Sequence, residues 1–163
     1  MNAPADPNTL LRAERQAQVV AALQPLLPRG ALLWTPEATT PYECDGLTAY
    51  RQRPLAVALP ETEAQVQAVL CACHDLGVPV VARGAGTGLS GGAMPDESGV
   101  TLSLAKFNRI LAIEPASRTA VVQCGVRNLA ISEAAAAYGL YYAPDPSSQI
   151  ACTIGGNVAE NSG

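Results

Sequence analysis

Hydrophobic positions divide the first half of the chain into helical and extended segments. Apolar residues recur every three or four positions over 9–27 and 60–76, which predicts two amphipathic helices, the first capped by Thr9. Short apolar runs at 55–59 and 78–82 flank the second helix and predict buried strands. A strand–helix–strand unit of this kind joins parallel strands through a right-handed crossover.

The second half of the chain has a different pattern. Apolar runs at 100–104, 110–113 and 119–123 predict strands, and the turn at 114–118 favours antiparallel pairing of the last two. An alanine-rich helix is expected over 126–138. We therefore predict an α+β fold, with a small parallel β-α-β sheet flanked by helices and then the start of a second, antiparallel subdomain.

Composition suggests a boundary near the first strand. Residues 1–54 hold the first helix and a stretch, 35–54, that is rich in Pro, Thr and Gly and predicts a long ordered loop or linker. Residues 55–163 hold the predicted sheets and are assigned to one domain.

Length, charge and composition limit the classes of protein to which this chain can belong. The chain has 163 residues, of which 48% are hydrophobic, enough for one domain with a core. A formal charge of −4 argues against a nucleic-acid partner. The sequence has no apolar run of about 18 residues that would span a membrane, and no signal peptide at its start, so we expect a cytoplasmic protein.

The cysteines do not predict a metal site or a disulfide framework. Their number is odd, five, which fits a reducing compartment. Cys71, Cys73 and His74 lie close in sequence, but on a helix positions 71 and 73 point apart, and no second ligand pair follows. We expect buried thiols there, and an exposed or helix-terminal His74, with no metal bound.

A glycine-rich loop follows the strand predicted at 78–82. The sequence from Pro79 is PVVARGAGTGLSGG, with glycine at 84, 86, 88, 91 and 92. Glycine lets several backbone N–H groups converge on one point, where they form a concave site for a phosphate. We expect residues 84–91 to hold a phosphate or diphosphate; a flexible surface turn is the alternative.

Two common phosphate loops do not fit. Residues 86–91 match G-x-G-x-x-G, but Pro95, Asp96 and Gly99 follow, and no helix can open there as the dinucleotide fingerprint requires. A P-loop is excluded because no Lys-Ser/Thr pair closes the loop.

Three segments together carry a resemblance to a known family. They are RGAGTGLSGG at 83–92, APDPSS at 143–148 and TIGGNVAENSG at 153–163, and the likeness extends to YECDGLTAY at 42–50 and GVRNLAIS at 125–132. The combination resembles the FAD-binding domain of the FAD-linked oxidases of the vanillyl-alcohol oxidase and p-cresol methylhydroxylase (PCMH) type. Within that group it is most similar to the FAD-binding subunits of bacterial glycolate oxidase (glycolate dehydrogenase).

The resemblance implies that FAD lies between two subdomains, with its diphosphate inside the glycine loop. It also implies that Gly86 and Gly155 line one shared hollow. Residues carried over as cofactor-binding are Arg83, Gly84, Gly86, Thr87, Gly88, Ser90, Gly91, Pro144, Ser147, Ser148, Thr153, Gly155, Gly156, Asn157 and Asn161.

Two assignments around this site stay open. Arg83 either adds charge for the diphosphate or forms a structural ion pair, and Tyr42, Asp45 and Tyr50 either approach the flavin or pack their own loop. Thr87 stands in the region where some family members carry a histidine that attaches the flavin, so we expect non-covalent FAD.

For the intact relative, the family implies oxidation of a small 2-hydroxy acid to a 2-oxo acid. Electrons would pass to partner redox subunits of a glycolate oxidase complex or to a membrane acceptor. Those subunits would place the protein at the inner face of the membrane. Family members are longer, so we expect an N-terminal fragment, inactive alone, with substrate-binding and catalytic residues after Gly163. The competing hypotheses are a nucleotide-binding module without redox chemistry and a structural remnant that binds nothing.

Overall fold

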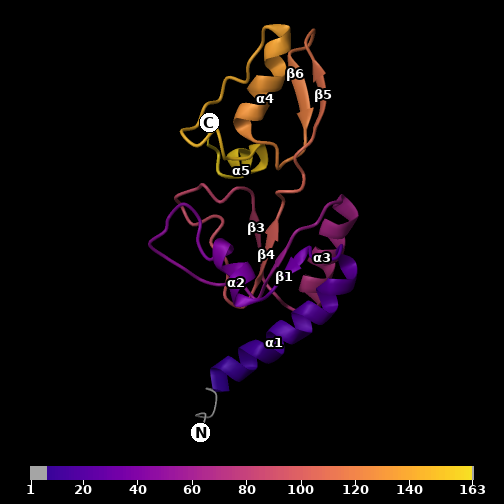
Figure 1. Cartoon of the computed structure of the whole chain (residues 1–163), viewed down its shortest axis with the longest axis vertical. Helices are drawn as coiled ribbons and strands as arrows, with labels where there is room; N and C mark the ends of the chain where they lie inside the picture. Colours follow the sequence, from indigo (N-terminus) through magenta and orange to yellow (C-terminus); the bar gives the residue numbers. More distant parts are fainter. Residues whose placement is uncertain (1–6, 163) are drawn as a thin grey trace.

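The computed structural model describes residues 7–162, which form two bodies stacked end to end with a narrow waist between them (Figure 1). The lower body holds a four-stranded sheet and the first three helices, and the upper body holds a two-stranded sheet and a fourth helix. The short helix α5 (Ile154–Ala159) lies at the waist. The predicted α+β architecture, parallel unit first and antiparallel subdomain second, is confirmed.

The sheet of the lower body is mostly parallel. Its strands, in spatial order, are β1 (Leu32–Leu33), β2 (Ala56–Ala58), β4 (Val100–Ser103) and β3 (Val80–Arg83). β1 runs antiparallel to β2, whereas β2 and β3 both pair in parallel with β4. The prediction of parallel strands on either side of the second helix is therefore confirmed.

The strand before the glycine loop is not buried as predicted. β3 is an edge strand and is half-buried, while β4 takes the centre of the sheet and is buried along its whole length. Hydrophobicity could not distinguish the two, because strand order is set by long-range pairing rather than by local sequence.

The helices of the lower body follow the sequence signals closely. α3 (Glu63–Asp75) begins with a capping box between Thr62 and Gln65, in which each side chain accepts from the other's backbone N–H. α1 (Pro7–Leu23) begins at Pro7, so the assignment of Thr9 as its cap is wrong; a 3₁₀ turn, η1 (Gln24–Leu26), continues it.

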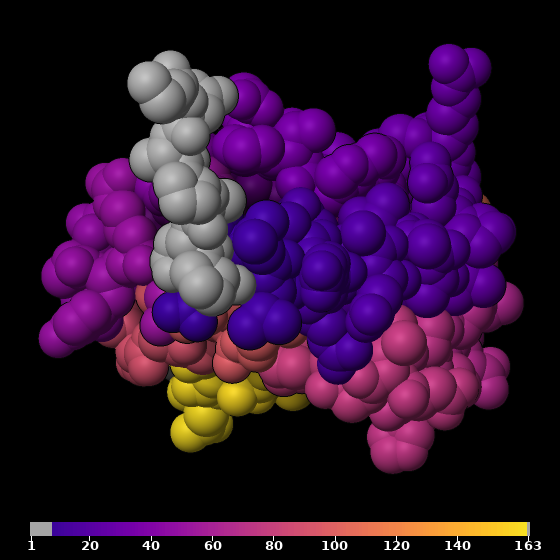
Figure 2. Space-filling model, turned by 90° about the horizontal axis from the view of Figure 1, so that it is seen from below, coloured from indigo at the N-terminus to yellow at the C-terminus, as the bar shows by residue number. Residues whose placement is uncertain are grey.

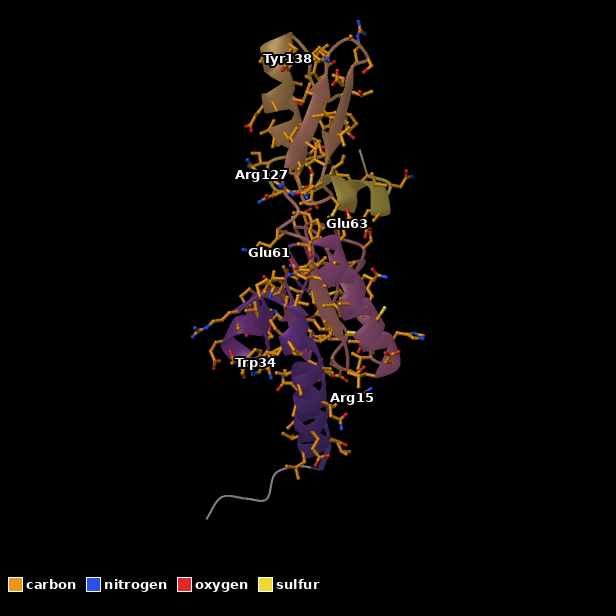
Figure 3. The ribbon with its side chains drawn as sticks, turned by 90° about the vertical axis from the view of Figure 1, so that its right-hand side faces the viewer. Arg15, Trp34, Glu61, Glu63, Arg127 and Tyr138 are labelled. Atoms are coloured by element: carbon orange, nitrogen blue, oxygen red, sulfur yellow. The ribbon has the colours of Figure 1, made fainter. Side chains whose placement is uncertain are left out.

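The first helix belongs to the core of the lower body. Val19 and Leu23 of α1 are fully buried beside residues of β2 and β4. Arg15 donates to the Leu76 carbonyl at the lower end of α3 (Figure 3), and Gln16 Nε2 donates to Leu55 O at 2.7 Å. α1 covers the lower end of the molecule (Figure 2). Residues before and after position 54, where the domain boundary was predicted, therefore belong to one sheet and one core.

The stretch predicted as a loop, 35–54, contains local helical structure. Thr35 caps a single helical turn, α2 (Pro36–Thr39), and a 3₁₀ turn, η2 (Thr40–Tyr42), follows. β1 was not predicted, because two residues are too few to show alternation.

The upper body is a hairpin packed on a helix. β5 (Ile110–Glu114) pairs antiparallel with β6 (Thr119–Val122), as predicted. α4 (Asn128–Ala135) and the 3₁₀ turn η3 (Ala136–Tyr138) fill the helix expected over 126–138, and Gly139 ends it in a left-handed conformation.

Candidate cofactor site

A cavity of about 800 Å³ opens at the waist. Its wall is formed by the end of β3, the glycine loop (residues 84–92), the 146–148 loop, and residues around the start of α5. Gly86 and Gly155 both line it, so the prediction that the two glycine-bearing segments share one hollow is confirmed. The volume lies within the roughly 300–1,000 Å³ typical of small-molecule and cofactor sites.

Most of the residues predicted to bind a cofactor line this cavity. They are Arg83, Gly84, Gly86, Thr87, Gly88, Ser90, Ser147, Ser148, Thr153, Gly155, Gly156 and Asn157. The lining is thus rich in hydroxyl groups and backbone amides, which are the donors that an anion without a bound cation requires.

Three of the predicted residues lie outside the lining. Gly91 accepts the N–H of Met94 within its own turn, and the Pro144 carbonyl accepts from Asn128 Nδ2 at 2.8 Å. Asn161 follows α5 in a left-handed conformation, with φ of 50°. The structure gives these residues local roles, and their contact with a cofactor stays a prediction.

The segments that form the wall touch one another directly. Thr153 lies against the backbone of Gly84, where a Cβ would overlap its hydroxyl. Ser148 Oγ lies 3.5 Å from Thr87 Oγ1, at the outer limit of a hydrogen bond. Both contacts join the glycine loop of the lower body to segments that come after the hairpin of the upper body. The shape of the cavity therefore depends on how the two bodies pack together.

Thr153 also carries an unpartnered polar atom. Its side chain is buried, and its Oγ1 has no hydrogen-bond partner among the described residues. A buried hydroxyl without a partner costs free energy, about 1–3 kcal/mol. The hydroxyl is covered by the backbone of Gly84 rather than open to the cavity, although other atoms of Thr153 line the wall.

A buried amide pair supports the wall from behind. Asn128 is fully buried at the start of α4; its Nδ2 donates to Pro144 O, and its Oδ1 accepts from Asn157 Nδ2 at 3.0 Å. Asn128 therefore links the loop at 144 to α5. Sequence analysis did not single out Asn128, although an amide among apolar helix positions was a signal for such a role.

Arg83 binds carbonyl groups of the protein. Its Nη1 donates to Cys44 O at 2.7 Å and lies 3.4 Å from Ala93 O, and the guanidinium lies over the Tyr42 ring at cation–π distance. Within residues 7–162 it forms no ion pair, so the structural ion pair considered as one alternative is wrong. Its contact with a cofactor stays a prediction.

Further lining residues were missed by the sequence analysis. Glu160 brings a carboxylate to the cavity, and Cys124 and Cys152 bring thiols. Burial raises the pKa of the Cys124 thiol, so it remains protonated at neutral pH. Glu160 lies in the segment at 153–163 that carries the resemblance but was not among the residues assigned to the cofactor, and no sequence signal marked the two cysteines.

The expected position of His74 is confirmed: it is exposed in the last turn of α3, away from the cavity. In the part of the chain that the structure describes, no group of three or more His, Cys, Asp or Glu residues could hold a metal ion. No helix among residues 7–162 is long and apolar enough to cross a membrane.

Comparison with known families agrees with this site. The model of the FAD binding domain family matches residues 54–163, more than half of the chain. The chain belongs to the FAD binding domain family. The matched range includes both glycine-bearing segments and the loop between them, and the resemblance found from those motifs is confirmed.

Curated relatives of this FAD-binding domain include 2-hydroxy-acid enzymes. Glycolate oxidase subunit GlcD of Escherichia coli K12 is 62% identical over 148 residues, which is 91% of this chain and 30% of the relative. D-lactate dehydrogenase of Archaeoglobus fulgidus is 38% identical over 107 residues, covering 66% of this chain and 24% of the relative. The chain thus spans less than a third of the length of these relatives.

Solved structures share the fold. p-Cresol methylhydroxylase with bound substrate superimposes with a TM-score of 0.77 at 24% identity, over 91% of this chain and 30% of that protein. This likeness confirms the PCMH-type FAD-binding fold.

Proposed function

We propose that this chain binds FAD non-covalently in the cavity at the waist and forms the flavin-binding part of an enzyme that oxidises a small 2-hydroxy acid. Membership of the FAD binding domain family supports the cofactor. The substrate class is supported by two relatives, a glycolate oxidase subunit and a D-lactate dehydrogenase, because glycolate and lactate are both small 2-hydroxy acids.

One observation carries the proposal: two glycine-bearing segments far apart in sequence line the same cavity. FAD fits the donors that are present. Its diphosphate needs many fixed donors, and the glycine loop, Thr87 and Ser148 offer backbone N–H groups and hydroxyls.

Each part of the wall takes a separate role in this proposal. The backbone N–H groups of residues 84–91 hold the diphosphate, and Ser147 and Ser148 lie beside the diphosphate and flavin. Thr153, Gly155 and Asn157 form the second contact segment. His74 is remote from the cavity, which supports non-covalent attachment.

When bound, FAD supplies the acceptor for the hydride that leaves C2 of the hydroxy acid; the protein supplies position and electrostatics. Partner redox subunits would then take the electrons. The E. coli relative supports this because it is itself one subunit of a glycolate oxidase.

The visible spectrum of the purified full chain tests this proposal. We expect a flavin band at about 450 nm that persists through desalting. In a protein of the length of its relatives, of which this chain spans less than a third, we expect glycolate or D-lactate to bleach that band without oxygen. Binding of ATP or NAD with no affinity for flavin would instead indicate a nucleotide-binding module without redox chemistry. A retained band that no 2-hydroxy acid bleaches in the protein of full length would contradict the substrate class alone.

A further inference from the structure

The guanidinium of Arg83, at the end of β3, lies between two backbone carbonyl groups and an aromatic ring. Its Nη1 donates to Cys44 O at 2.7 Å and approaches Ala93 O, at the far end of the glycine loop, at 3.4 Å. Its Cζ lies 5.6 Å from the centroid of the Tyr42 ring, within the range of a cation–π contact. Arg83 thus interacts with carbonyl oxygens and an aromatic ring rather than with a carboxylate.

Arg83 also fits against the glycine loop itself. Gly86 has a φ of +69°, and a Cβ there would overlap the Arg83 guanidinium. The loop therefore takes a left-handed turn at Gly86 and lies directly on the guanidinium. Arg83 thus supports the middle of the loop and, through Ala93 O, its end.

A second contact joins the same two segments. We call residues Tyr42–Gly46 the strap. Gly46 N donates to Gly88 O at 2.9 Å, and a Cβ at Gly46 would lie only 2.7 Å from Thr87 O. Two hydrogen bonds therefore hold the strap in place. Arg83, which directly precedes the glycine loop, donates to Cys44 O, and Gly46 N donates to Gly88 O within the loop.

Given the proposed function, we propose that Arg83 and Tyr42 are positioning residues that press the strap onto the glycine loop and hold its N–H donors ready for the FAD diphosphate. Arg83 lines the cavity, but Tyr42 does not. Tyr42 can thus affect binding only through Arg83 and the strap, whereas a charge supplied directly to the diphosphate would not depend on Tyr42. Fixing a loop in its bound conformation increases affinity by lowering the ordering cost of binding.

The dissociation constant of FAD from the full chain distinguishes these roles. We expect Tyr42→Phe, which keeps the ring, to bind as wild type, and Tyr42→Leu and Arg83→Met each to bind at least about tenfold more weakly, a change of about 1.4 kcal/mol. The double variant should bind no more weakly than Arg83→Met alone, because both changes break one contact. Arg83→Lys should remain as weak as Arg83→Met.

Tyr50→Leu is the matched control: Tyr50 lies in the same stretch of chain, but it is 66% exposed, is outside the strap and is absent from the cavity lining. It should bind FAD as wild type. Wild-type affinity in Tyr42→Leu, or recovery of affinity in Arg83→Lys, would overturn the positioning role and favour a direct charge on the diphosphate.

Amide hydrogen exchange without FAD keeps this inference separate from the proposed function. We expect Tyr42→Leu and Arg83→Met to increase exchange across the glycine loop and the strap while β2 and β4 keep wild-type protection. That result would support the inference even if the wild-type chain failed to bind FAD. Unchanged exchange in the glycine loop would overturn it, whatever the wild type binds.

Discussion

The hydroxyl of Thr153 lies against the backbone of Gly84, so closely that a Cβ at residue 84 would overlap it. This contact joins the first residue of the glycine loop to the segment before α5. Neither glycine-bearing segment predicts a cofactor site strongly by itself. Because Gly84 and Thr153 both line the cavity, the two segments form one surface where they touch.

Substituting Gly84→Ala should damage the site by steric overlap with Thr153. We expect a loss of stability of about 1–3 kcal/mol, the usual cost of an extra methyl in a packed place, together with weaker FAD binding. Thr153→Ala removes the obstructing hydroxyl and leaves only its own Cβ, 3.6 Å from the new methyl. The double variant should therefore unfold at higher urea than Gly84→Ala alone; equal or lower resistance would contradict the contact.

Gly88→Val should separate binding from folding. A Cβ at Gly88 meets nothing within 4 Å and φ is not in the left-handed region, yet the residue lines the cavity. Stability should change by no more than about 0.5 kcal/mol, as for most surface positions, while flavin is no longer retained on desalting. Full retention of flavin with a normal unfolding curve would argue against the glycine loop as the diphosphate site.

Asn128→Ala should destabilise the chain through its lost hydrogen bonds. The change leaves the Pro144 carbonyl without its donor and Asn157 without its acceptor. The buried Asn157 amide left without a partner costs about 1–3 kcal/mol, whereas the half-buried Pro144 carbonyl costs less because water reaches it. Urea denaturation measures the sum. Asn108→Ala, at an exposed amide just before β5, is the control and should stay within about 0.5 kcal/mol of wild type. An equal effect of the two changes would rule out the linking role of Asn128.

Stability should fall as the pH rises above the ordinary thiol range. Burial raises the pKa of Cys73 in the core of the lower body, so the unfolded chain loses this proton first. The free energy of unfolding is then highest below the unfolded thiol pKa, about 8.5, and is lost as the pH rises toward the raised folded value. Unfolding curves between about pH 7 and pH 10 measure this, and Cys73→Ala should flatten the decline; an identical slope in that variant would contradict it.

The sequence was sufficient for features that local chemistry determines. The helix between the first two predicted strands, the stop at Gly139 and the hairpin of β5 and β6 each follow from a few neighbouring residues. The shared cavity could also be predicted, because the motifs on both of its sides resemble one family. Contacts between distant segments could not be predicted this way.

Some misses were local, such as the cap of α1 and the short turns α2 and η2, but those that shape the site depend on pairing between distant segments. β4 enters between β2 and β3, which makes β3 an edge strand, and no local pattern marks that insertion. Arg83 was weighed as a phosphate ligand or an ion-pair partner, but its partners are the carbonyls of Cys44 and Ala93. A backbone carbonyl is present at every residue, so a sequence cannot indicate which one a guanidinium will reach.

The central claim is that the two glycine-bearing segments hold one diphosphate between them. A crystal structure of the full chain with FAD tests it most directly. We predict that the diphosphate lies in the cavity at the waist, within hydrogen-bond distance of backbone N–H groups of residues 84–91 and of a donor from residues 153–157. A diphosphate that contacts only one of these segments, or that lies outside the cavity, would contradict the account.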